Sequence, residues 1–192
     1  MRDVTTSDST NGPVDIVDVV RSYQPDGDGA SHRSALELLE SDTPAWPRTV
    51  FEPGHFTASG FVGSPDGGSM LLIHHAKLDR WLQPGGHFEP IDDTIEAAAR
   101  REVGEETGVH DIVRRGRSLV RIDAHPIPAR DPEPGHTHFD LGVGFQAKSF
   151  SIGPIDEVLE ARWVRFDDLA KYDADGAVLG AAVRLQELLS MQ

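Results

Sequence analysis

The chain has 192 residues, and 18 Lys and Arg against 32 Asp and Glu give a formal net charge of −14 at pH 7. This balance argues against general nucleic-acid binding and against an anionic membrane surface, because both partners are bound through basic patches. Cysteine is absent, which excludes disulfides, Cys-ligated zinc and a thiol nucleophile. With 38% hydrophobic residues, the chain can build the core of one domain with some extra length.

The apolar runs at residues 70–73 and 177–183 are too short to cross a bilayer. Residues 1–13 are polar and carry acids, so they do not resemble a signal peptide. We therefore expect a cytoplasmic protein with no membrane partner.

Residues 1–12 are rich in Thr, Ser, Asp, Asn and Gly, which predicts a disordered tail. Residues 13–47 predict a helical N-terminal extension, with a short helix at 14–23 and a second helix that ends before Pro44. Ser34 and Glu37 have the spacing of a capping box at the start of that second helix. The extension could pack on the domain, cover a site or form the contact of a homodimer; simple packing is the favoured role.

Residues 48–192 predict an α+β domain. Strands are expected at 55–63, 70–75, 118–124, 138–150 and 160–164, and a turn at 65–68 joins the first two. Helices are expected at 95–107 and 176–189. Strands mixed with two main helices favour a mixed sheet held between helices.

The helix predicted at 95–107 carries most of the chemical information. Asp93 and Glu96 have capping-box spacing, and Gly108 is a natural stop. At about 100° per residue, an apolar stripe continues into three glutamates, Glu102, Glu105 and Glu106. These carboxylates repel one another, so at least one should have a raised pKa. A solvated acidic face is the plain interpretation, but a hard divalent cation would turn the repulsion into attraction.

This helix and the loop before it resemble the Nudix box. The pattern Arg-Glu-(aliphatic)-x-Glu-Glu-x-Gly-(aliphatic) is matched at every specified position over residues 101–109, and residues 81–86 are similar to the usual lead-in. The resemblance covers residues 56–189 and implies a Nudix-like α/β/α sandwich with a mixed central sheet.

The spacing within the box departs from the family pattern. Fourteen residues separate Gly86 from Arg101, one more than the family has. Counting forward from Gly86 places Asp92 at the first acid of the box, whereas counting back from Arg101 places Asp93 there. We favour the forward count, with the extra residue in the loop before the helix.

The resemblance implies a metal-dependent hydrolase that cleaves a diphosphate linkage in a nucleoside diphosphate joined to another moiety. It assigns Mg²⁺ or Mn²⁺ to the Gly86 carbonyl and to the carboxylates of Glu102, Glu105 and Glu106. Arg101 would pair with Asp92 or Asp93 and brace the loop. For the catalytic base, the candidates are Glu105, Glu106 and Glu157, the last from a loop before the final strand, with Glu160 as its competitor.

Histidines add a second group of candidates. His136 and His138 alternate on a predicted strand, so their rings should share one face with Asp140. His87 lies in the expected metal loop. These histidines could contact substrate phosphate or a metal, although ordinary hydrogen-bonded side chains are the plainer interpretation.

A catalytically silent Nudix-fold ligand sensor or regulator is the alternative function. The intact acids favour the enzyme, and the extension is too short and acidic to resemble a DNA-binding winged helix. The prenyl-diphosphate isomerases of this fold use a catalytic cysteine, which this chain lacks. The expected partner is a small phosphorylated substrate such as a nucleotide.

Overall fold

The computed structural model describes residues 12–76, 78–155 and 158–191. Within them the helices are α1 (Ile16–Ser22), α2 (Ala30–Glu40), α3 (Ile95–Thr107) and α4 (Gly176–Ser190), with a 3-10 helix, η1 (Phe166–Tyr172). The strands are β1 (His55–Gly63), β2 (Ser69–His75), β3 (Arg80–Leu82), β4 (Gly85–His87), β5 (Ile112–Arg114), β6 (Arg121–Ile127), β7 (His136–Ala147) and β8 (Glu160–Arg165).

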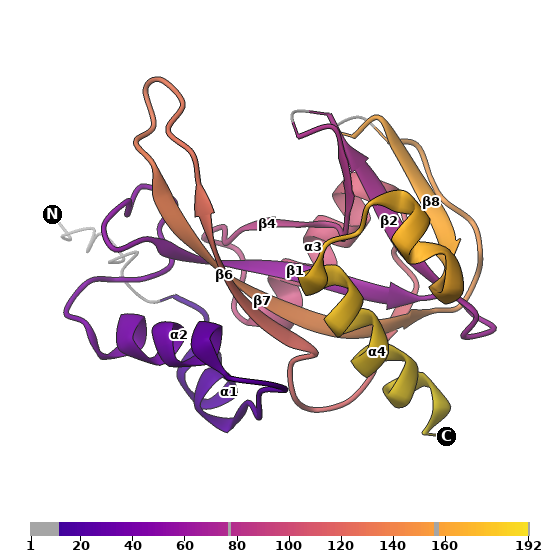
Figure 1. Cartoon of the computed structure of the whole chain (residues 1–192), viewed down its shortest axis with the longest axis horizontal. Helices are drawn as coiled ribbons and strands as arrows, with labels where there is room; N and C mark the ends of the chain where they lie inside the picture. Colours follow the sequence, from indigo (N-terminus) through magenta and orange to yellow (C-terminus); the bar gives the residue numbers. More distant parts are fainter. Residues whose placement is uncertain (1–11, 77, 156–157, 192) are drawn as a thin grey trace, which may run out of the picture.

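All of these strands belong to one mixed sheet, as predicted. Its main path runs β3-β2-β1-β7-β5, while β4 pairs with β1, β6 with β7 and β8 with β2. The pair β1–β7 is parallel and places His55 opposite His138, and the remaining pairs are antiparallel. The hairpin of β6 and β7 extends beyond the rest of the sheet (Figure 1).

Strand β1 separates the two sides of the core, because its alternate residues face opposite ways. Gly60 faces α3, where a Cβ atom would lie 2.3 Å from the Val103 side chain. Phe61 belongs instead to the apolar cluster that contains Leu185 of α4. Figure 1 shows α4 in front of the sheet and α3 behind it. The predicted α/β/α layering is therefore confirmed.

The N-terminal helices pack on the α3 side of the molecule. Ile16, Val20 and Leu38 are buried in the same apolar cluster as the core residues of α3. The Asp15 carboxylate accepts a hydrogen bond from the Ile95 backbone N–H at 3.0 Å. The helical extension is thus present and touches the start of α3. Its boundary at residue 48 stays a prediction, and the predicted tail falls almost wholly on residues 1–11, outside the described residues.

The two capping-box predictions are wrong. Helix α2 begins at Ala30, ahead of Ser34, because Gly29 adopts a left-handed φ of 67° and the Asp28 carboxylate accepts from the Ala30 N–H. Helix α3 has the predicted bounds, but its cap is Thr94, whose hydroxyl oxygen accepts from the Ala97 N–H at 3.1 Å.

The other boundaries differ in smaller ways. Strand β6 lies further along the chain than residues 118–124, and β7 begins and ends earlier than residues 138–150. The short elements β3, β4, β5 and η1 were not predicted. No helix in the described part of the chain is long and apolar enough to span a membrane.

Candidate active site

Helix α3 presents its three glutamates to different surroundings. Glu106 is buried, and its carboxylate accepts a hydrogen bond from the Gly85 N–H at 2.8 Å. The Glu102 side chain is 12% exposed, whereas that of Glu105 is 49% exposed. In this acidic stripe, Glu102 and Glu106 therefore turn toward Gly85 and Gly86, which form the glycine loop. Glu105 turns toward solvent.

Arg101 joins the loop to the helix. Its guanidinium donates to the Asp92 carboxylate at 2.9 Å and to the His87 carbonyl at 2.8 Å. It also donates to Glu102 and Glu105, each at 2.9 Å. Burial lowers the pKa of Arg101, but the contacts with Asp92 and Glu102 outweigh it and raise the pKa above its usual value. A pair this enclosed restrains the loop more than a surface ion pair would.

Asp92 takes the place of the first acid of the box. It is buried, it contacts Arg101, and its second role is to accept from the Glu89 N–H at 2.8 Å. This contact closes a turn over residues 89–92, inside the normal five-residue spacing after Gly86. The additional residue of the box therefore falls after Asp92, because residues 93–100 are one more than the seven of the family. The structure agrees with the forward count from Gly86.

The Glu102 carboxylate lies directly against Gly86. A Cβ atom at position 86 would lie 2.5 Å from a Glu102 carboxylate oxygen. The glycine thus lets carboxylate and loop backbone approach each other, and both offer oxygen atoms. Hard cations such as Mg²⁺ and Mn²⁺ prefer oxygen ligands, so the residues present fit a divalent ion.

Burial changes the acidity of Glu102. Its pKa is raised, chiefly by burial, while Arg101 opposes the shift and Glu105 adds to it. The predicted direction is confirmed, but the main cause is desolvation and not the repulsion between carboxylates.

The predicted pairing of His136 and His138 on one face is confirmed. Their Nε2 atoms lie 3.0 Å apart, and the ring of His87 lies 5.0 Å from that of His138 between centroids. The sequence reasoning missed His55, which is fully buried and lies 4.8 Å from His138. The signal available in the sequence was the alternation of His55, Thr57 and Ser59 along a predicted strand, which places these three polar side chains on one face.

His87 and His138 are neutral near pH 7. Burial, followed by the neighbouring His55, lowers the pKa of His87 to about 4 and that of His138 to about 2. The ring of His125 lies at the margin of the group, and its hydrogen bond to Asp123 raises its pKa. His87 and His138 thus offer hydrogen bonds and lone pairs, and no positive charge for a phosphate.

Asp140 follows the histidines along the same face. It is buried and accepts from the Thr57 hydroxyl at 3.0 Å and from the Ser59 hydroxyl at 2.8 Å. Burial raises its pKa.

The two predicted bases before the last strand have different outcomes. Glu157 lies outside the described residues. Glu160 lies in β8, where its carboxylate accepts from the Arg162 guanidinium, so it already has an ion-pair partner.

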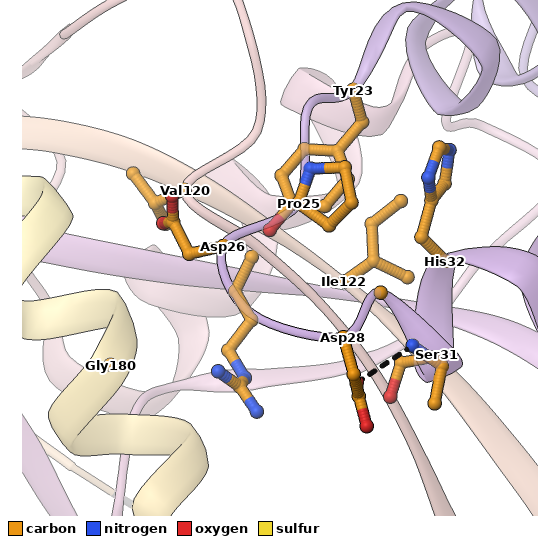
Figure 2. A pocket seen from close by; sticks show the side chains of 12 residues that line it. Tyr23, Pro25, Asp26, Asp28, Ser31, His32, Val120, Ile122 and Gly180 are labelled. Carbon is orange, nitrogen blue, oxygen red and sulfur yellow. Dashed lines mark hydrogen bonds between the residues drawn. The ribbon is translucent and has the colours of Figure 1, made fainter.

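The hollow shown in Figure 2 lies elsewhere, between the N-terminal extension and β6. It has a volume of about 110 Å³ and is lined by residues such as Tyr23, Asp28, Ser31 and Ile122. None of the described site residues predicted from the sequence lines it.

The profile of the NUDIX domain matches residues 54–183, which include the glycine loop, α3 and the histidine strands. The chain belongs to the NUDIX family. It is therefore a hydrolase of pyrophosphate-containing substrates, and Nudix hydrolases generally use divalent metal ions.

Solved structures share the fold at low sequence identity. A Nudix hydrolase from M. smegmatis, RenU, is 22% identical with a TM-score of 0.52, over 71% of this chain and 86% of that one. An Ap4A hydrolase binary complex from C. elegans is 16% identical with a TM-score of 0.53, over 70% and 97%. The NUDIX domain of Shewanella oneidensis NrtR complexed with ADP ribose is 20% identical with a TM-score of 0.51, over 81% and 98%. No curated protein matches the chain.

Proposed function

We propose that this Nudix hydrolase cleaves the diphosphate linkage of a nucleoside diphosphate joined to another moiety. The observation that carries the proposal is the convergence of α3 on the glycine loop: Glu106 binds the Gly85 N–H, and Glu102 lies against Gly86. Mg²⁺ or Mn²⁺ would be held by Glu102, Glu105, Glu106 and the Gly86 carbonyl. When bound, the ion would activate water and offset charge at the reacting phosphorus.

The protein's own groups have distinct tasks in this proposal. Arg101 holds Asp92 and the His87 carbonyl, and so keeps the loop in place against α3. Glu105 and Glu106 are the proposed bases within the helix, and Glu157 is the proposed base outside it. Glu105, like Glu160, accepts a hydrogen bond from an arginine. It is the more accessible of the two helical candidates, which favours it over Glu106 for taking a proton from water.

The substrate class is proposed from the neighbours and from the histidine face. One neighbour is named for Ap4A hydrolysis and another is complexed with ADP ribose, so we propose a nucleotide. His87, His136 and His138 are proposed to contact it. Because His87 and His138 are neutral near pH 7, these two would do so through hydrogen bonds.

A panel assay tests the proposal. The purified chain is incubated with ADP-ribose, Ap4A and nucleoside triphosphates, in Mg²⁺ or in Mn²⁺, and the products are separated and quantified. Metal-dependent cleavage at a diphosphate is expected for at least one compound. Tight binding of ADP-ribose without turnover in either metal would support the ligand sensor instead.

A further inference from the structure

We propose that His55, His87 and His138 form a second metal site, which binds a zinc-like transition metal ion. One ring nitrogen from each residue lies within 4.8 Å of the others. The three come from different strands, β1, β4 and β7, and none belongs to the acidic stripe of α3. The inference goes beyond diphosphate hydrolysis and does not depend on it. Each imidazole has two ring nitrogens, so a histidine that binds the ion through one would keep the other N–H for the substrate contact proposed above.

His55 supplies the strongest observation. Its Nδ1 atom lies 2.8 Å from the Val50 carbonyl oxygen, so Nδ1 carries the proton and donates it. The lone pair is then on Nε2. This atom is buried and has no hydrogen-bond partner among the described residues. A buried polar atom without a partner is costly, and coordination of a metal ion would satisfy it.

His136 lies beside this site, and its Nδ1 atom, like that of His55, contacts a backbone carbonyl. Its Nδ1 atom lies 2.9 Å from the Pro134 carbonyl, and its Nε2 atom lies 3.0 Å from that of His138. Metal-binding histidines typically donate their second N–H to such a carbonyl, which sets the tautomer and the ring orientation. Nitrogen ligands of tetrahedral zinc, at ~2.0–2.1 Å from the ion, are about 3.3 Å apart, close to the 3.0 Å between the Nε2 atoms of His136 and His138. His136 is thus adjacent to His138 at the edge of the site, whereas the residues whose ring nitrogens all lie within 4.8 Å of one another are His55, His87 and His138.

The sheet holds the three rings before any ion arrives. His55 and His138 are opposite each other in the parallel β1–β7 pair, and His87 is opposite Thr57 in the β4–β1 pair. Binding would therefore order little additional structure. Imidazole nitrogen is a good ligand for Zn²⁺ and a poor one for Mg²⁺, so this site and the acidic stripe would select different ions.

Zn²⁺ titration in excess Mg²⁺ tests the proposal. The full chain, first stripped with EDTA and dialysed, is titrated by calorimetry while Mg²⁺ competes for the carboxylates. We expect one equivalent of Zn²⁺ to bind. His87→Gln and His138→Gln should each weaken the affinity by at least about tenfold. His110→Gln is the matched control, because His110 is exposed and lies beyond the end of α3.

Co²⁺ gives a readout that does not depend on heat or activity. The visible absorption of four-coordinate Co²⁺ should appear with wild type, with His110→Gln and with Glu102→Gln, and should be lost in His138→Gln. Circular dichroism identifies any variant that fails to fold, and the remaining histidine variant then decides. Absence of Zn²⁺ binding to wild type, equal affinity in folded His138→Gln, or loss of binding in Glu102→Gln would each overturn the proposal.

Discussion

Two side-chain clusters meet at Gly86 and His87, and they offer different ligand atoms. One offers carboxylate oxygens and the other offers imidazole nitrogens. On the α3 side, carboxylates are tied together by Arg101. On the other side of β4, imidazoles lie ring to ring. Because neighbouring residues of a strand face opposite ways, Gly86 meets Glu102 while His87 meets His55. Strand β4, which has three residues, thus separates the carboxylate cluster from the histidine cluster.

Replacing a charged glutamate of the carboxylate cluster by glutamine should have the largest effect, which is a loss of turnover. We expect Glu102→Gln and Glu106→Gln each to lower turnover by about two orders of magnitude or more, because each removes charge that would hold the catalytic ion. Kinetics at saturating metal measure the loss. Glu187→Gln, an exposed position on α4, is the matched control. Unchanged turnover in both folded variants would defeat the assignment of the box glutamates.

Adding or removing Mg²⁺ should change the stability of the chain. An ion at a hundredfold excess over its dissociation constant stabilises the folded state by about 2.7 kcal/mol. For a chain of this size the melting temperature would rise by about 5–10 °C. Melts in EDTA, in Mg²⁺ and in NaCl of equal ionic strength measure the shift. If NaCl gives the same rise in melting temperature as Mg²⁺, the ions act on the three glutamates of α3 only through charge screening.

Gly86→Ala should impair the carboxylate cluster and leave the histidine cluster unchanged. The added Cβ would lie 2.5 Å from a Glu102 oxygen, so the carboxylate must move away from the loop. Turnover should fall by about tenfold, equal to about 1.4 kcal/mol, while Zn²⁺ affinity stays near that of wild type. Gly176→Ala is the control, since no atom lies within 4 Å of its added Cβ. Equal loss of both properties would show that the clusters act as one site.

The smallest expected effect concerns the extension. Asp15→Ala removes the acceptor for the Ile95 N–H at the start of α3, which should cost about 1 kcal/mol of unfolding free energy. Thermal melting measures it as a decrease of about 2–4 °C. Asp42→Ala, exposed and outside the helices, is the control. Zn²⁺ affinity should not change, because the Asp15 carboxylate bonds to Ile95 at the start of α3 and not to the histidines. A parallel loss of Zn²⁺ affinity would contradict the separation of the extension from the histidine cluster.

The sequence by itself determined the elements whose signals are local. Helix α3 was predicted with its bounds because the apolar period and Gly108 act within one segment. Strand β1 was predicted with its bounds as well, and the box glutamates were found from their spacing on one helix.

Only the tertiary structure decided the features that depend on pairing between distant segments. Strand β4 has two glycines and weak β propensity, and it exists because it pairs with β1. Asp92 was chosen over Asp93 by the reach of Arg101 from α3. His55 joined the other histidines through the parallel register of β1 and β7, with 82 intervening residues between it and His138. Such register is set by burial across the whole sheet, which no local pattern records.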